Sequence, residues 1–194
     1  MMRVDADMQN EANKLRVDDA LNKAQIEADR LAFDKEAGFT NLRGENALKR
    51  PNGKPLADEY GETLQASIGK ISADLGNDSQ RQLFAARSNN LVTSFKRQAI
   101  QHETREHNVW ADGVDENTVK LRMSDIGKNF NSPGVVSAAI NGTEDDQGNR
   151  TPGIRDAIES MAKRNGKPKE WVDTVVNGLV SDAHKSVVLR LMDQ

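Results

Sequence analysis

The residues best suited to chemistry in this sequence lie between His102 and His107, a segment that reads His-Glu-Thr-Arg-Glu-His. Zinc peptidases use the pattern H-E-x-x-H, in which two histidines four residues apart lie on one face of a helix. Here Glu106 stands in the place of the second histidine. The inverted pattern H-x-x-E-H would match Glu106 and His107, but it requires a histidine at position 103, which is a glutamate. Two ligands of a metal site remain conceivable, and His184 is the one other histidine. The alternative, which we favour, is a solvated, charged helix face with ion pairs four residues apart.

The second group of chemical interest surrounds His184 in the last segment of the chain. Ser181, Asp182 and Ser186 are its neighbours in sequence, but this spacing on one helix does not bring a serine, a histidine and a carboxylate into a triad. Valines and leucines flank the histidine on one side. We therefore expect His184 to be a packed, hydrogen-bonded residue of an apolar helix face.

The polar loop at residues 141–150 invites a calcium interpretation. With Gly148 at the sixth place of an EF-hand, the first ligand would be Thr143 and the last Ile154, whereas the site requires an acidic residue first and a bidentate glutamate last. The alternative is that the loop binds cations only adventitiously.

The segment 51–55, Pro-Asn-Gly-Lys-Pro, is a turn and not a phosphate-binding loop. We predict no catalytic, cofactor-binding or metal-binding residue, no cofactor and no small-molecule substrate.

The two tryptophans are the largest apolar anchors. Trp110 lies among polar residues, so it is either packed against another helix, which we favour, or an exposed contact residue.

These candidates must be positioned by helices, and the dominant one is predicted over residues 79–130. It contains no proline and, if continuous, spans roughly 78 Å. Gly113 is a point at which it would bend or break. Along this helix, a line of residues spaced alternately four and three apart (a 4-3 seam) is apolar at both ends and polar in the middle. We therefore expect the two ends of the helix to pack against different neighbours. The seam comprises Phe84, Ser88, Leu91, Phe95, Gln98, His102, Arg105, Val109, Asp112, Glu116, Val119, Met123, Ile126 and Phe130.

Shorter helices are predicted at 3–37, 56–75, 134–140, 152–164 and 170–192, with no strand-like alternation. In the first, a seam of Val17, Leu21, Ala24, Ala28 and Leu31 predicts packing along another helix. The predicted fold is all-α, an elongated multi-helix bundle with one very long central helix. We divide it into an N-terminal helix (1–38), a region with the long helix (39–131) and a C-terminal helical subdomain (132–194).

The composition indicates a thin core. Hydrophobic residues make up 36% of the 194 residues and aromatic residues 4%, which suits extended helices or a protein that buries more surface on assembly. The 27 basic and 30 acidic residues nearly balance, so the charge does not favour a nucleic-acid module. Cysteine is absent, and no segment resembles a signal peptide or membrane span. We expect a soluble protein made in the cytosol.

Three local patterns occur in a recognisable order. They are Leu42-Arg43-Gly44-Glu45-Asn46-Ala47, the helix start from Asn77 to Phe84 with Gln80-Arg81, and His102-Glu103 with Glu106. The tail adds Gly166-Lys167-Pro168 before an amphipathic helix. Together they resemble the helical segment of internal, or ejection, virion proteins of short-tailed bacteriophages. The resemblance covers most of residues 38–194.

The resemblance implies a virion protein near the portal that forms homo-oligomers, contacts other virion proteins and packaged DNA or the host envelope, and assists genome delivery. Some family members carry a lytic transglycosylase domain, of which this sequence has no signature, so the expectation is a structural protein and not an enzyme. Two alternatives stay open. One is a fragment of a cell-wall or metal-dependent hydrolase that uses His102, Glu106 and His107. The other is a small regulatory or nucleic-acid binder with Lys96-Arg97 and Lys163-Arg164 as basic clusters.

Overall fold

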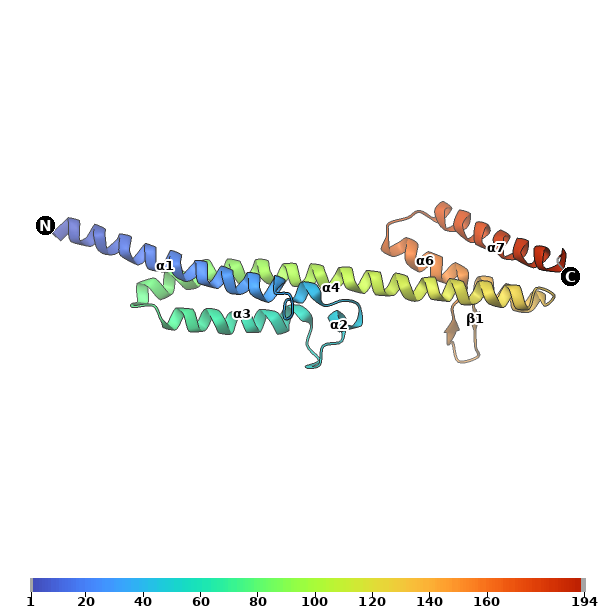
Figure 1. Ribbon diagram of the computed structural model, residues 1–194, viewed down its shortest axis with the longest axis horizontal. Helices are drawn as coiled ribbons and strands as arrows, with labels where there is room; N and C mark the ends of the chain where they lie inside the picture. The colour runs from blue at the N-terminus through green and yellow to red at the C-terminus, as the bar shows by residue number, and fades with distance from the viewer. Residues whose placement is uncertain (1, 193–194) are drawn as a thin grey trace. The chain divides into compact units, whose positions relative to one another are not determined.

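A computed structural model describes residues 2–192, and the side chains of residues 6–189 and 192. Over these residues the fold is all-α, as predicted (Figure 1). The described elements are α1 (Met2–Phe33), a 3-10 turn (Phe39–Asn41), α2 (Glu45–Leu48), α3 (Leu56–Ala73), α4 (Asp78–Lys128), α5 (Pro133–Asn141), β1 (Thr143–Glu144), β2 (Arg150–Thr151), α6 (Ile154–Arg164) and α7 (Lys169–Met192).

The 51-residue helix α4 confirms the long helix expected from the sequence, and it continues through Gly113 without a break. The chain forms two compact units, and the boundary lies within α4: unit 1 ends at His107 and unit 2 begins at Asn108. From the sequence alone, we expect the divisions near residues 38 and 131.

Unit 1 is built from α1, α3 and the first part of α4, with the short turns between them. Its core contains the predicted seam of α1, in which Val17, Ala24 and Leu31 are buried. Phe39 lies at the centre of the second half of this core, edge-on to both Tyr60 and Phe95 at centroid distances of 5.6 and 5.5 Å. Such pairs add stability beyond the apolar area that they bury.

Unit 2 combines the last part of α4 with α5, α6 and α7. Its buried core consists mainly of small and β-branched side chains, including Val119, Ile126, Ile154, Ile158, Val172 and Val176. Trp171 packs against this core. The residues between α5 and α6, expected to be an irregular polar loop, form a small antiparallel hairpin in which Thr143 pairs with Thr151.

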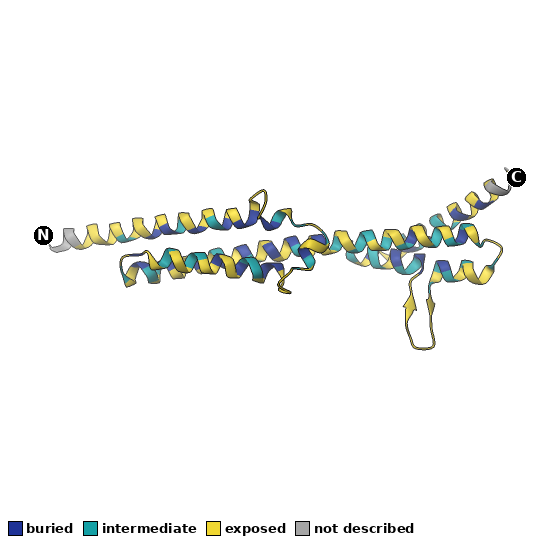
Figure 2. Ribbon diagram, turned by 60° about the horizontal axis from the view of Figure 1, so that its bottom comes forward, coloured by how far each residue is buried: buried dark blue, intermediate teal, exposed yellow. Residues whose placement is uncertain are grey.

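The buried face of α4 differs from the predicted seam in its middle. Gln98, Arg105 and Val109 are exposed, whereas Ala99 and Glu106 are buried. A strict 4-3 seam drifts by about 20° per heptad around a straight helix, so the residues facing the core shift by one position along the chain. Figure 2 shows the buried residues along the facing sides of the helices in each unit.

Candidate functional site

A buried polar cluster in unit 1 joins α4 to the loop that follows the 3-10 turn. His102 and Glu106, one helical turn apart, are 6% and 5% exposed. His102 Nε2 lies 2.8 Å from the carbonyl oxygen of Leu42. Since a carbonyl can only accept, this nitrogen carries a proton. The imidazole also packs against Phe39, with ring centroids 5.8 Å apart.

Glu106 completes the attachment of the loop. Its Oε1 accepts a hydrogen bond from Arg43 Nη1 at 2.7 Å, and its Oε2 accepts one from the Gly44 backbone N–H at 3.0 Å. Gly44 has a φ of 51°, a conformation that glycine adopts without the steric cost of a Cβ. The loop is thus shaped so that one side chain and one backbone donor converge on a single carboxylate.

The electrostatics of this cluster keep Glu106 ionised. Burial raises the pKa of the Glu106 carboxyl, but the Gly44 N–H, the Arg43 hydrogen bond and the Arg43 charge together lower that pKa below its ordinary value. A buried carboxylate with two donors accepts protons poorly. It is therefore suited to holding the loop and not to general-base catalysis near neutral pH.

The expectation of a solvated, charged face was wrong for these two residues. His102 and Glu106 are buried and contact the loop, whereas Glu103 is half-buried and His107 exposed. Across the described residues no group of three or more histidine, aspartate or glutamate side chains could hold a metal ion. The side chains that would have supplied two ligands instead bind the protein's own backbone and Arg43.

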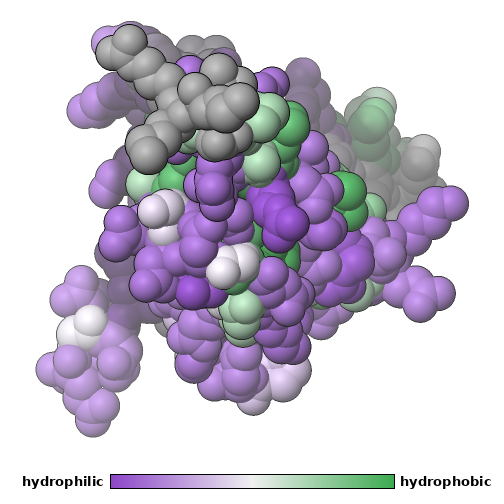
Figure 3. Space-filling model, turned by 90° about the vertical axis from the view of Figure 1, so that its left-hand side faces the viewer, coloured by the Kyte–Doolittle hydropathy of each residue, from purple (hydrophilic) through white to green (hydrophobic). Residues whose placement is uncertain are grey.

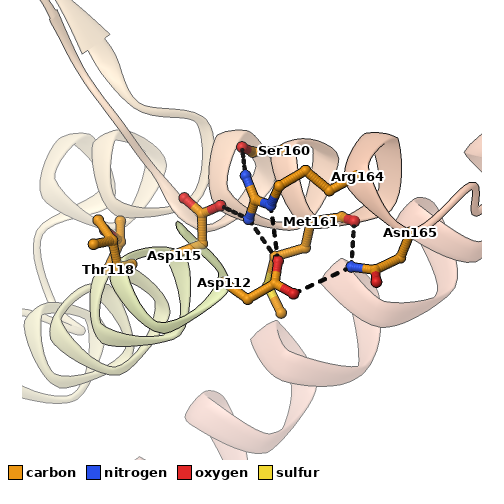
Figure 4. Close-up of polar contacts among 8 residues, drawn as sticks. Asp112, Asp115, Thr118, Ser160, Met161, Arg164 and Asn165 are labelled. Atoms are coloured by element: carbon orange, nitrogen blue, oxygen red, sulfur yellow. Dashed lines mark hydrogen bonds and ion pairs between the residues drawn. The ribbon is translucent and has the colours of Figure 1, made fainter. Parts of the chain in front are cut away.

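A second polar cluster lies in unit 2, where α6 meets α4 (Figure 4). Arg164 donates to Asp112 Oδ1 through Nε at 2.9 Å and Nη2 at 2.7 Å, and Nη2 also contacts Asp115. Its Nη1 donates to Ser160 Oγ at 2.7 Å. Asn165 donates to the Met161 carbonyl and, at 3.4 Å, to Asp112.

This cluster resembles a carboxylate pair for acid–base work, but the guanidinium occupies it. Partial burial lowers the pKa of Arg164, and the bonds and charges of Asp115 and Asp112 outweigh that effect, so the pKa is raised and the guanidinium stays charged. The three side chains are between 17% and 28% exposed. The arrangement fixes α6 on α4, because one planar cation bridges two carboxylates.

Two other sequence predictions were also wrong. His184 is exposed on the surface of α7 instead of packed. Trp110, expected in the core, is 39% exposed. The apolar neighbours of His184 and the size of the Trp110 side chain suggested burial, but the packed face of each helix is a different one.

In the loop considered for calcium, Asp145 organises its own turn. Its Oδ1 accepts hydrogen bonds from the backbone N–H groups of Gln147 at 2.9 Å and Asn149 at 2.8 Å, and its Oδ2 accepts one from the Asn149 side chain. The carboxylate is thus committed to the hairpin that it closes.

Sequence reasoning missed Arg43, Gly44 and Arg164 as partners in these clusters. The first two stand in a conspicuous Leu-Arg-Gly segment, but the glutamate that they bind is about sixty residues away in sequence. Arg164 was considered only as part of a basic cluster, and its partners lie 49 and 52 residues earlier. No local spacing signals contacts of this range.

No family model, curated protein or solved structure matched this chain in our comparisons. Within the described residues, none of the helices combines the length and the apolar character required to span a membrane.

Proposed function

We propose that this chain is a structural component of a bacteriophage particle, of the internal or ejection type, which acts as a homo-oligomer near the portal and assists genome delivery. The observation that carries the proposal is that the residues on which the resemblance rests hold helices and loops together. Leu42, Arg43 and Gly44 from the first pattern bind His102 and Glu106 from the third. The patterns therefore specify a helical scaffold.

The second pattern has the same character. Gln80 is 4% exposed, and its side chain accepts a hydrogen bond from the Gly76 N–H at 2.8 Å and donates one to Asn13 Oδ1 at 2.8 Å. Asn77 caps the start of α4 by accepting from the Gln80 N–H at 2.9 Å. This group attaches α1 to the α3–α4 turn. Residues used in this way support a role in architecture more than one in catalysis.

The hydrolase alternative loses its main support on the same grounds. It required His102 and Glu106 to face a substrate or metal, and both side chains are buried against the protein's own loop. The regulatory binder loses part of its support, because one cation of each basic cluster is engaged within the chain: Lys96 contacts Asp58, and Arg164 is bound by two aspartates. The partners proposed here are copies of the chain, other virion proteins such as the portal, and the packaged DNA or host envelope.

Two measurements test the proposal. Light scattering on the purified chain over a hundredfold concentration range should show a defined multimeric mass. Quantitative mass spectrometry of purified particles of the encoding phage should detect the chain in stoichiometric amounts relative to the portal. A protein that is monomeric throughout and missing from the particles would refute the proposal, including its location in the virion.

A further inference from the structure

Helix α1 has a second apolar line on the side that faces away from the core of unit 1. Met8, Leu15, Ile26 and Phe33 are 59%, 63%, 68% and 62% exposed. Their spacings of seven, eleven and seven residues bring them onto one narrow stripe, since eighteen residues make five complete turns. This stripe is on the side of the helix opposite Val17, Ala24 and Leu31, which are buried.

The stripe follows a strict 4-3 repeat over most of the helix. The positions between the four large side chains are Ala12, Asp19, Asn22 and Asp29, all exposed. Large apolar residues at such positions are typical of helices that pair in a coiled coil, and polar residues among them set register at a cost in stability. We refer to these eight residues, from Met8 to Phe33, as the outer seam of α1.

The first part of α1 has little support from its own chain. The side chains of residues 6–12 are all exposed, and this part of α1 extends past the α3–α4 turn (Figure 2). Viewed from the side of the N-terminus, the surface is mainly hydrophilic with a few separate hydrophobic patches (Figure 3). A helix segment without tertiary packing is marginal in water, so a partner on the outer seam would stabilise this part.

The charges beside the outer seam indicate what that partner is. Glu11 and Asp18 flank it on one side, and Arg16 and Lys23 flank it on the other. In a parallel pair of helices, a residue that directly precedes Ala12, Asp19, Ile26 or Phe33 faces the residue five places later on the second helix. Glu11 would then face Arg16 of a second copy, and Asp18 would face Lys23.

These charges are available for such pairs. Among the described side chains, neither Glu11 nor Arg16 forms an ion pair within the chain. Asp18 uses only Oδ1 in its bond to Arg87, at 2.7 Å. Lys23 contacts Asp19 at 2.8 Å in a solvent-exposed pair, which contributes little and can be exchanged.

An antiparallel pair would also match the apolar residues, because Met8 would meet Phe33 and Leu15 would meet Ile26. It would, however, bring Arg16 of one copy beside Lys23 of the other, and Asp18 would find no cation. The parallel pair carries a different cost, since Asp19 and Asp29 each face their own counterpart. The charge complementarity favours the parallel arrangement. The repulsion between the facing aspartates weakens the association of the two copies.

We propose that the outer seam of α1 is where a second copy of this chain binds, in parallel and in register. This inference rests on the proposed homo-oligomer and names the surface through which two copies meet.

Disulfide trapping tests the register directly, because the chain has no cysteine of its own. Ala12→Cys leaves the four large side chains in place, and mild oxidation should convert most of the protein into a covalent dimer. Gln101→Cys, an exposed position on α4, is the matched control and should remain uncrosslinked. Crosslinking only when Ala12→Cys is mixed with Asp29→Cys would establish the antiparallel pair and overturn the proposal.

The second readout is the strength of self-association, measured by sedimentation on variants that carry no introduced cysteine. Leu15→Asp should weaken association about tenfold or more, whereas Ile100→Asp, at an exposed position on α4, should not. Asp19→Asn should strengthen association, because it removes a repulsion present only in the parallel pair. If the chain is multimeric but these variants have no effect, the seam is not the interface, and the proposed function stands. If the chain is monomeric yet abundant in virions, this inference and the proposed homo-oligomer both fail, and only the assignment to the virion stands.

Discussion

The Glu106 carboxylate holds a loop that is distant in sequence, through one hydrogen bond from a side chain and one from a backbone N–H. Replacing it with glutamine keeps the shape but removes the charge. We expect Glu106→Gln to lower the free energy of unfolding by about 1–3 kcal/mol, because hydrogen bonds to charged, buried acceptors are the stronger ones. Urea denaturation measures this loss. The same substitution at the exposed Glu116 of α4 is the control and should change stability by less than about 0.5 kcal/mol.

The charge of Glu106 also predicts a pH dependence. Its pKa in the folded protein is lowered from the ordinary value of 4.5. The stabilisation is therefore complete above about pH 4.5 and is lost as the pH falls through the lower, folded pKa. The stability difference between wild type and Glu106→Gln should be constant at neutral pH and should narrow in acid. A difference that persists unchanged to pH 3 would contradict the assigned role.

At the scale of the element, α4 is notable for tolerating a glycine in its interior. A Cβ added at Gly113 would meet no atom within 4 Å, and the same is true of Gly69 in α3. We expect Gly113→Ala to stabilise the protein by about 0.5–1 kcal/mol, because alanine loses less backbone entropy in a helix. Gly69→Ala should give a similar gain. Thermal unfolding followed by circular dichroism would show both, and destabilisation by Gly113→Ala alone would mean that α4 bends at this residue.

The attachment of α6 to α4 depends on Arg164, whose guanidinium serves both Asp112 and Asp115. Arg164→Ala leaves two partly buried carboxylates facing each other, and we expect a loss of about 1–3 kcal/mol. Lys163→Ala, at the exposed neighbouring position, should have little effect. Hydrogen exchange should show faster opening of α6 in the first variant only. Equal protection in the two variants would remove Arg164 from this role.

At the scale of the whole molecule, the decisive feature is that each unit has its own buried core. The contacts of Glu106 lie within unit 1 and those of Arg164 within unit 2, with no shared partner. Substitutions at independent sites add to within about 0.5 kcal/mol. The double variant Glu106→Gln, Arg164→Ala should therefore lose the sum of the two single losses. A coupling energy above about 1 kcal/mol in a double-mutant cycle would show that the two sites are not independent.

How far the sequence alone predicts this protein depends on the range of the interaction concerned. The all-α class, the extent of α4 and the buried seam of α1 follow from the spacing of Val17, Ala24 and Leu31 and from the lack of breakers between Ser79 and Phe130. These are local properties, because helical periodicity and capping act over a few residues. They determined the longer helices to within a few residues at each end, but not α2 or the hairpin of β1 and β2.

The tertiary structure alone decided what the polar residues do. His102 and Glu106 have the spacing of either a charged surface or half a metal site, and only the approach of Leu42, Arg43 and Gly44 assigns them to a buried contact. The same holds for Arg164 with Asp112. A buried polar group must find a hydrogen-bond partner, but periodicity does not say where in the chain that partner lies.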